Sequence, residues 1–343
     1  MSDIDIRVEG RAGRITLTRP AALNALTYDM VMAVEAALEA WRDAADVALV
    51  VLDAAGDKAF CAGGDIADLY ASGKAGDVAY GRRFWADEYR VNAKLAEYGK
   101  PIVSLMQGFT MGGGVGLGCH AGTRVVGETS RIAMPECGIG LVPDVGGSWL
   151  LARAPGRLGT YLGVSAARME AGDAILAGFA DYFVPQEAWP DLIAALCETG
   201  DAGAVARVSE KAPQGPLSAM TAQIDRLFAG VTLADVVAAL EADDSAFAAE
   251  TLKALRRNSP LAMACTLAML DRLRAAKTTI RDALDLEYRF TARAMQQSDF
   301  LEGIRAAIID KDRKPVWKHT IETLPDAAVS AMLAPLGQDA LSL

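Results

Sequence analysis

Hydrophobic and polar residues alternate over short stretches in the first half of the chain. Alternation at every second position predicts strands over residues 4–9 and 14–18, joined as a hairpin by a turn at residues 10–13. Uninterrupted apolar runs predict two more strands, buried on both faces, at residues 47–53 and 101–107. Together these patterns predict a layered α/β fold.

Helical periodicity separates these strands and then dominates the second half. Thr27 is a suitable N-cap for a helix that continues to about Arg42 and has one apolar face. That face consists of Met30, Val34, Ala37, Leu38 and Trp41. Strand patterns end at about residue 190, and amphipathic helices follow. These helices are predicted over residues 217–229, 232–241, 244–257, 260–276 and 279–298.

This change of pattern predicts an α/β core over residues 1–200, which holds the active site, and a mainly helical region over residues 201–343 that packs on it. The chain of 343 residues is 52% hydrophobic and 23% charged, so it can bury a sizeable core. Its net charge of −10 disfavours nucleic-acid binding, which requires clustered Lys and Arg. A small anionic ligand is still compatible with this charge, because backbone N–H groups can bind it.

Cysteine usage and the N-terminal residues bear on the compartment. Five cysteines without a CxxC pair favour a reducing environment over a disulfide framework or a zinc ribbon. The first ten residues resemble neither a signal peptide nor a transit peptide, so cytoplasmic localisation is predicted. Residues 101–123 carry no formal charge, yet their proline and glycines favour a buried strand, a turn and a buried helix. No membrane association is therefore predicted.

Two glycine-rich segments follow predicted apolar strands. Residues 58–66 (KAFCAGGDI) end in a double glycine and an acid, and residues 108–118 (GFTMGGGVGLG) place three glycines before a helix. Because glycine has no Cβ, such backbone can approach a ligand closely and present unpaired N–H groups to it. The alternative for the first segment is an ordinary tight turn capped by Asp65, and for the second it is close helix packing. The second segment does not match a dinucleotide fingerprint, because Leu117 occupies the last glycine position of that motif.

A third segment, residues 134–148 (MPECGIGLVPDVGGS), contains two acids without other charges. These acids, Glu136 and Asp144, are costly to bury unless they are paired or used in chemistry. Two carboxylates in a dry site are suited to acid–base or nucleophilic catalysis. The alternatives are helix caps or ion pairs with Arg131 or Arg153.

Other catalytic chemistries lack the residues they need. The histidines are His120 and His319, and no metal-binding array such as HExxH is present, so no metal and no cofactor are predicted. Ser148 does not lie in a GxSxG elbow, and no histidine is near Cys137 in the sequence.

Taken in chain order, these three motifs resemble the crotonase (enoyl-CoA hydratase/isomerase) superfamily. The motifs are AFCAGGDI at 59–66, GFTMGGGVGLG at 108–118 and MPECGIGLVPDVGGS at 134–148. Residues 299–312, followed by Pro315 and Trp317, look most like the 3-hydroxyisobutyryl-CoA hydrolases within it. The resemblance covers nearly the whole chain. It implies a spiral core of repeated ββα units with a helical C-terminal region, and an acyl-CoA substrate whose CoA is not a separate cofactor.

The resemblance also assigns site residues. It implies an oxyanion hole at the N–H groups of Gly64 and Gly113. Glu136 matches an acid that hydratases retain, whereas Asp144 stands where hydratases usually have glycine. The second hydratase glutamate falls at Gly116, so the sequence favours hydrolysis over addition of water to an alkene.

The expected reaction is hydrolysis of 3-hydroxyisobutyryl-CoA in valine breakdown, with 3-hydroxypropionyl-CoA as a second substrate. Glu136 is expected to act as general base or as nucleophile through a mixed anhydride, and Asp144 to orient the substrate hydroxyl or the water. Gly64, Gly113, Glu136 and Asp144 are all expected to contact the substrate. Glu88 matches a helix residue that the hydrolases use near the substrate, although a solvated helix acid is the alternative.

Two other functions stay open at this point. One is an enoyl-CoA hydratase or isomerase for short acyl-CoA, and the other is a non-catalytic crotonase-like binding protein. The resemblance is also compatible with a homo-oligomer.

Overall fold

The computed structural model describes residues 3–274 and 277–343, and its packing divides the chain into two compact units. Unit 1 consists of Met1–Gly64, Arg90–Ala133 and Arg168–Ser218. Unit 2 consists of Asp65–Tyr89, Met134–Ala167 and Ala219–Leu343. The two units interleave along the sequence, and the division into residues 1–200 and 201–343 stays a prediction.

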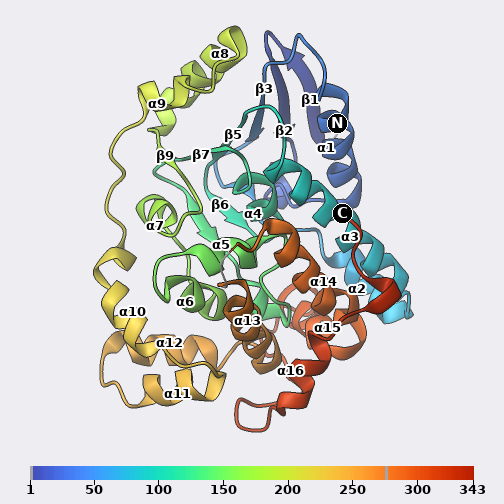
Figure 1. The fold of residues 1–343 in the computed structure, drawn as a ribbon, viewed down its shortest axis with the longest axis vertical. Coiled ribbons are helices and arrows are strands. Elements are labelled where there is room, and N and C mark those ends of the chain that lie inside the picture. Colours follow the sequence, from blue (N-terminus) through green and yellow to red (C-terminus); the bar gives the residue numbers. More distant parts are fainter. Residues whose placement is uncertain (1–2, 275–276) are drawn as a thin grey trace. The chain divides into compact units, whose positions relative to one another are not determined.

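All described strands belong to unit 1, where they form two sheets (Figure 1). The six-stranded sheet has the order β1-β2-β3-β5-β7-β9, and only its β1–β2 pair is antiparallel. The three-stranded sheet, β4-β6-β8, is parallel throughout. The strands are β1 Ile4–Glu9, β2 Ala12–Leu17, β3 Leu49–Ala54, β4 Ala59–Cys61, β5 Ile102–Met106, β6 Phe109–Met111, β7 Thr123–Val126, β8 Arg131–Ala133 and β9 Tyr182–Phe183.

From β3 to β9, consecutive strands alternate between the two sheets. β3, β5 and β7 lie in the large sheet, and each is followed in the chain by a strand of the small sheet, β4, β6 or β8, and then by helical structure. This is the repeated ββα arrangement expected from the sequence, so the predicted α/β fold class is confirmed. Residues at the carboxyl ends of the short strands are thereby placed at equivalent points of successive repeats.

The predicted hairpin forms with a tighter turn than expected. Glu9 pairs with Ala12, so the turn is Gly10–Arg11 and β2 begins two residues before the predicted 14–18. Gly10 has a φ of +57°, and a Cβ there would lie 2.3 Å from the carbonyl oxygen of Cys197. Glycine is the residue that meets both conditions.

The α-helices of unit 1 lie between its strands in the chain or after them. α1 (Tyr28–Trp41) begins after Thr27, whose side chain accepts a hydrogen bond from the N–H of Met30 at 3.3 Å, and its predicted apolar face is buried. The other α-helices lying wholly in unit 1 are α4 Gly113–Gly118, α7 Ala171–Leu176, α8 Trp189–Thr199 and α9 Ala204–Val208. α8 packs its Trp189, Leu192 and Leu196 against the buried valines and leucines of the parallel strands.

The regular secondary structure of the described residues of unit 2 is helical, and α13 packs there against α5, α6 and α14 (Figure 1). The predicted helices of the second half are confirmed, although α13 ends at Leu273 and residues 275–276 of the predicted 260–276 helix lie outside the described residues. α3 (Val78–Ala96) contributes its residues up to Tyr89 to unit 2 and the rest to unit 1. The other helical segments are α2 Ala67–Ala75, η2 Glu136–Ile139, α5 Gly147–Arg153, α6 Leu158–Ser165, α10 Thr221–Leu227, α11 Leu233–Glu241, α12 Ala246–Leu255, α13 Pro260–Leu273, α14 Ile280–Gln297, α15 Phe300–Ile304, η5 Arg305–Ile309 and α16 Asp326–Met332.

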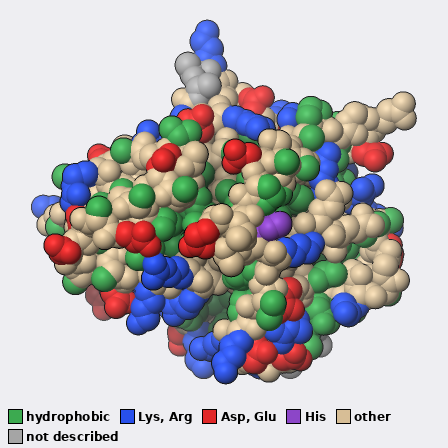
Figure 2. Space-filling view, turned by 90° about the horizontal axis from the view of Figure 1, so that it is seen from below, with side chains coloured by type: hydrophobic (Ala, Val, Ile, Leu, Met, Phe, Trp, Pro, Cys, Tyr) green, Lys and Arg blue, Asp and Glu red, His purple; other side chains and the backbone are tan. Residues whose placement is uncertain are grey.

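The surface carries charges of both signs. On the face shown in Figure 2, acidic and basic side chains are interspersed with apolar ones. No helix among the described residues has the length and apolar character needed to cross a membrane, and the uncharged residues 101–123 form β5, β6 and α4 instead. Assembly into a homo-oligomer stays a prediction.

Candidate active site

The two predicted oxyanion-hole glycines lie at the same edge of the small sheet in unit 1. Cys61 of β4 pairs with Thr110 of β6 in parallel register, and Gly64 and Gly113 each follow three residues later. Adjacent parallel strands are about 4.8 Å apart, so equal offsets from a paired position keep the two segments side by side. The sequence prediction that these distant glycines come together is consistent with this register.

Packing between the two glycine segments excludes a side chain at Gly114, and the backbone conformation disfavours one at Gly63 and Gly112. A Cβ on Gly114 would lie 2.2 Å from the carbonyl oxygen of Cys61, and a Cβ on Gly63 would lie 3.5 Å from that of Met111. Gly63 and Gly112 have φ values of +115° and +49°, which side-chain-bearing residues rarely adopt. Each of these glycines therefore reorients the chain immediately before a predicted oxyanion amide.

Both amides are available to a ligand. Within the described residues, neither the N–H of Gly64 nor that of Gly113 donates to a protein acceptor. The loop before Gly64 is fixed by other groups, because the N–H of Ala62 donates to the Leu23 carbonyl at 3.0 Å and the Gly63 carbonyl accepts from Leu26 at 2.9 Å. Unit 1 thus presents two held, unpaired donors, which is the requirement for stabilising a developing oxyanion.

The predicted site acids gather in unit 2. Glu88 lies on α3, Glu136 opens the turn η2, and Asp144 precedes α5. Each of the three side chains is only 5% exposed. The alternative that Glu88 is a solvated helix acid is therefore wrong, because its helix face is buried rather than open to water.

Asp144 interacts electrostatically with both of the other acids. Its Oδ2 accepts a hydrogen bond from the hydroxyl of Tyr89 at 2.8 Å. Burial raises the pKa of Asp144 to about 7, although the hydrogen bond from Tyr89 opposes the shift. Burial and then repulsion from Asp144 raise the pKa of Glu88 to about 8. The same two causes raise the pKa of Glu136 well above its ordinary value.

Glu136 keeps one oxygen without a partner. Its Oε2 is buried and has no hydrogen-bond partner among the described residues. An unpaired buried carboxylate oxygen is costly, and such groups are found where a water or ligand is to be bound. Glu136 therefore retains a buried acceptor oxygen that no described residue of the protein uses.

The alternative ion pairs do not form within the described residues. Arg131 pairs with Glu170 at 3.5 Å, and Arg153 lies over the Trp149 ring with its Cζ 4.6 Å from the centroid. Neither arginine contacts Glu136 or Asp144, so the two acids are not neutralised structural partners.

Glu287 of α14 is a further buried acid beside these three, and the sequence analysis did not single it out. It is 0% exposed, and its Oε2 accepts from the N–H of Gly146 at 2.8 Å. Its Oε1 accepts from the N–H of Ser148 at 3.1 Å and from the Ser148 hydroxyl. Burial raises the pKa of Glu287 to about 8 against the opposing hydrogen bonds from Ser148. The detectable signal was an acid on the apolar face of an amphipathic helix, between Ala283 and Phe290.

The late segment singled out in the sequence supports the turn η2. A Cβ on Gly303 of α15 would lie 2.1 Å from the carbonyl oxygen of Ile139, so this glycine permits close packing of the two elements. Asp299 accepts from the Ser259 hydroxyl at 2.6 Å, and the Ser259 N–H donates to the Cys137 carbonyl at 2.9 Å. Residues far along the chain therefore hold the acid-bearing turn in place.

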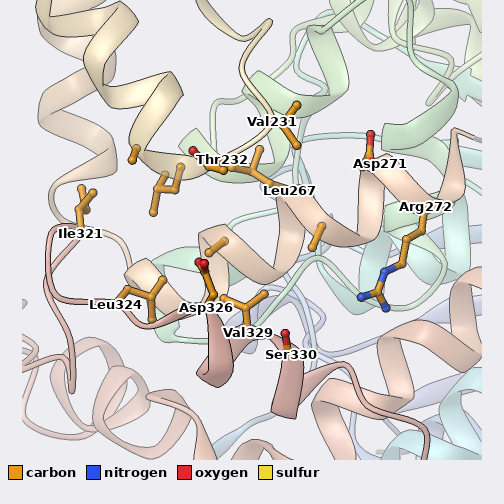
Figure 3. A pocket seen from close by; sticks show the side chains of 14 residues that line it. Val231, Thr232, Leu267, Asp271, Arg272, Ile321, Leu324, Asp326, Val329 and Ser330 are labelled. Carbon is orange, nitrogen blue, oxygen red and sulfur yellow. The ribbon is translucent and has the colours of Figure 1, made fainter.

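A separate cavity of about 380 Å³ lies among α11, α13 and α16 in unit 2 (Figure 3). It is lined mainly by apolar side chains, including Leu267, Leu324 and Val329, with Asp271 and Arg272 at the same wall. It is distinct from the acid cluster, because its lining includes none of Glu88, Glu136, Asp144 and Glu287. Among the described residues no group of His, Cys, Asp and Glu is arranged to hold a metal ion.

Alternating ββα units, paired glycine amides and buried carboxylates define a crotonase-type protein. The chain belongs to the enoyl-CoA hydratase/isomerase family, whose model matches residues 12–333. It is 35% identical to the mitochondrial 3-hydroxyisobutyryl-CoA hydrolase of Gallus gallus, over 100% of this chain and 91% of that protein. It is 36% identical to the human protein of the same name, over 92% of this chain and 84% of that protein.

Solved structures with the same fold carry other names. An enoyl-CoA hydratase from Rhodobacter sphaeroides has a TM-score of 0.96 and 62% identity, with complete coverage of both chains. A carnitinyl-CoA dehydratase from Mycobacterium thermoresistibile has a TM-score of 0.95 and 40% identity, covering 100% of this chain and 99% of that one.

The predicted cytoplasmic localisation is wrong, because the curated relatives are named as mitochondrial proteins. The physical reason is that a compartment is addressed by signals that receptors recognise, whereas composition and cysteine usage reflect only the redox and charge demands on the folded domain.

We expect Gly114→Ala to lower the free energy of unfolding by about 1–3 kcal/mol, the usual cost of overpacking. The new methyl group would meet the Cys61 backbone, which cannot move without disturbing β4. Gly122→Ala is the matched control, because the nearest atom to its Cβ would be the Ile102 oxygen at 4.0 Å. Chemical denaturation followed by circular dichroism measures both, and equal stability of the two variants would contradict the close approach.

The buried acids should make the protein less stable at alkaline pH. Glu88, with its pKa raised to about 8, binds its proton more tightly folded than unfolded. This stabilisation is fully present below about pH 4 and is lost as the pH rises through about 8. We therefore expect the unfolding temperature to fall between about pH 5 and about pH 9, and to fall less in Glu88→Gln.

The control for this pH series is Asp243→Asn, also in unit 2. Hydrogen bonds from Ser245 and then Arg226 lower the pKa of Asp243 to about 2, so this acid stays ionised across the whole series. Asp243→Asn should keep the wild-type slope, and a Glu88→Gln slope equal to it would argue against the raised pKa.

Proposed function

We propose that this chain hydrolyses the thioester of 3-hydroxyisobutyryl-CoA to the free 3-hydroxy acid and CoA. Full-length similarity to hydrolases of that name supports this substrate. A role in valine breakdown is part of the proposal, and 3-hydroxypropionyl-CoA is the second candidate substrate. No metal and no cofactor are needed for this reaction, since the attacking group is water or a carboxylate.

The observation that carries the proposal is the position of the acids. Asp144 is buried and accepts a hydrogen bond from the Tyr89 hydroxyl, and its charge raises the pKa of Glu136. Gly116, where the second hydratase glutamate would fall, is a buried glycine within α4. A hydratase needs two carboxylates around the alkene. This chain has a glycine, Gly116, at one of those two positions and carries an acid, Asp144, at a different place.

In the proposed mechanism, the N–H groups of Gly64 and Gly113 bind the thioester oxygen. Each such donor contributes roughly 3–4 kcal/mol to transition-state stabilisation. Glu136 removes a proton from water, the resulting hydroxide adds to the carbonyl carbon, and the tetrahedral oxyanion collapses to expel the CoA thiolate. Asp144 orients the substrate hydroxyl or the water, and in its protonated form it donates its proton to the thiolate. The proton that Glu136 took from water then passes to Asp144 and restores both acids. Glu88 contacts the substrate beside these acids.

The raised pKa values indicate that Glu136 and Asp144 share protons near neutral pH, and they do not by themselves assign the base role to either acid. A cluster of repelling acids holds protons near neutral pH, so one member can be ionised as base while another is protonated as acid. The pKa of Asp144 at about 7 places its proton transfer close to the working pH.

A nucleophilic route uses the same residues. Glu136 would attack the carbonyl carbon to form a mixed anhydride and release CoA, and water would then cleave the anhydride. Single-turnover hydrolysis in ¹⁸O-labelled water separates the two routes. Label found in the Glu136 carboxylate supports the anhydride, and label confined to the product acid supports direct attack by water.

We expect Glu136→Gln and Asp144→Asn each to lower kcat for CoA release by about 100-fold or more, the scale for a lost acid–base group. Glu250→Gln, on an exposed face of α12, is the matched control and should keep wild-type kcat. A thiol-capture assay on 3-hydroxyisobutyryl-CoA measures all three.

The rival function is hydration of a short enoyl-CoA, which the name of the Rhodobacter sphaeroides structure favours. Loss of crotonyl-CoA absorbance, measured beside thiol release, distinguishes the two activities. Fast hydration without thiol release would overturn the hydrolase proposal. Silence in both assays would favour the non-catalytic binding protein.

A further inference from the structure

The turn that carries Asp144 has a strained backbone. Val145 and Gly146 are consecutive residues in the left-handed region, with φ values of +53° and +76°. Glycine adopts this conformation readily, but a β-branched valine does so only when its surroundings impose it. Val145 is 1% exposed, so the strain is set within packed structure and not on a free loop. Contacts with neighbouring residues are therefore needed to keep this turn in its strained conformation.

Glu287 supplies that hold from α14. Its two carboxylate oxygens accept three hydrogen bonds, from the N–H of Gly146, the N–H of Ser148 and the Ser148 hydroxyl. Glu287 is fully buried, and among the described residues no Lys or Arg forms an ion pair with it. The turn donors are therefore its main stabilising partners, and they lie directly after Asp144 and Val145 in the chain.

Asp144 is then fixed from two sides within unit 2. Tyr89 of α3 donates to the Asp144 side chain at 2.8 Å, while Glu287 restrains the backbone that follows it. The Tyr89 ring is itself set edge-on against Tyr288, the next residue on α14, at a centroid distance of 6.3 Å. One helix thus restrains both the backbone and the side-chain partner of Asp144.

We propose that Glu287 is a positioning residue of the reaction, which acts by holding the Asp144–Ser148 turn so that the Asp144 carboxylate stays aimed at the substrate. This inference rests on the proposed function, because it gives Glu287 a role through Asp144. Glu287 itself does not contact the reacting atoms, since its carboxylate oxygens accept from the turn.

The contacts require a carboxyl group and not merely a polar side chain of that size. All three partners donate, and a carboxyl group offers acceptor lone pairs on both oxygens whether ionised or protonated. A glutamine would direct its NH₂ group at one of these donors. Two donors then face each other in a buried site, which costs more than losing a single hydrogen bond.

The kinetic test uses Glu287→Gln, Asp144→Asn and the double variant in the thiol-release assay. We expect Glu287→Gln to lower kcat by about tenfold or more while KM changes by less than about threefold, as for an interaction expressed in the transition state. The double variant should lose no more than Asp144→Asn alone, because Glu287 acts through Asp144. Wild-type kcat in Glu287→Gln, or multiplied losses in the double variant, would overturn the inference.

Two further variants guard against a merely structural effect. Ser148→Ala removes only the hydroxyl donor and leaves both N–H contacts, so its loss of kcat should be smaller than that of Glu287→Gln. Asp285→Asn, on the same helix, removes a surface pair with Arg289 at 2.7 Å and should behave as wild type. Equal losses in Glu287→Gln and Asp285→Asn would indicate general damage to α14 and contradict a positioning role.

Amide hydrogen exchange at Gly146 and Ser148 tests whether Glu287 restrains the turn, and this measurement does not require an active enzyme. We expect exchange of at least one of these amides to be about tenfold faster in Glu287→Gln than in wild type, because the glutamine NH₂ group replaces one of the two acceptor oxygens. If wild type releases no thiol, the proposed function fails while this measurement still decides whether Glu287 holds the turn. Unchanged exchange in Glu287→Gln would refute the hold even in an active enzyme.

Discussion

Several carboxylates are buried together with no basic partner among the described residues, and this is the constraint on which unit 2 depends. Glu88, Glu136, Asp144 and Glu287 are each at most 5% exposed, and burial comes first among the causes that raise their pKa values. A protein tolerates such a cluster only when protons are shared or hydrogen bonds compensate the charge. Tyr89 and the backbone of the Asp144–Ser148 turn provide that compensation. Burial thus favours the protonated form of each of these acids.

In unit 1, the N–H groups of Gly64 and Gly113 have no protein acceptor among the described residues, yet the backbone that carries them is fixed. Parallel pairing of β4 with β6 places Gly64 and Gly113 at equal offsets, and glycines with positive φ precede both. The loop around Gly63 is tied to Leu26, so its geometry does not rely on a ligand. Donors fixed in advance cost no reorganisation when charge develops on a substrate oxygen, which is why such a site accelerates acyl chemistry.

The same family scaffold supports hydration and hydrolysis, so the fold does not decide the reaction. The names of related proteins point in both directions, since full-length relatives are hydrolases and the structure with 62% identity is called a hydratase. The chemistry is better indicated by where the acids lie. A glycine at position 116 and an acid at position 144 remove one hydratase carboxylate and add a buried group coupled to Glu136.

The sequence by itself determined the element types and supplied the candidate site residues. Thr27, the apolar runs and the glycine motifs act through local rules of capping, burial and backbone freedom, so their consequences were predictable. The family resemblance identified Glu88, Glu136 and Asp144, and the structure adds their burial. Tertiary structure alone decided which partners these acids have. Glu287 lies more than a hundred residues from the turn it holds, and only packing of α14 brings them together, because no local pattern encodes a contact of that separation.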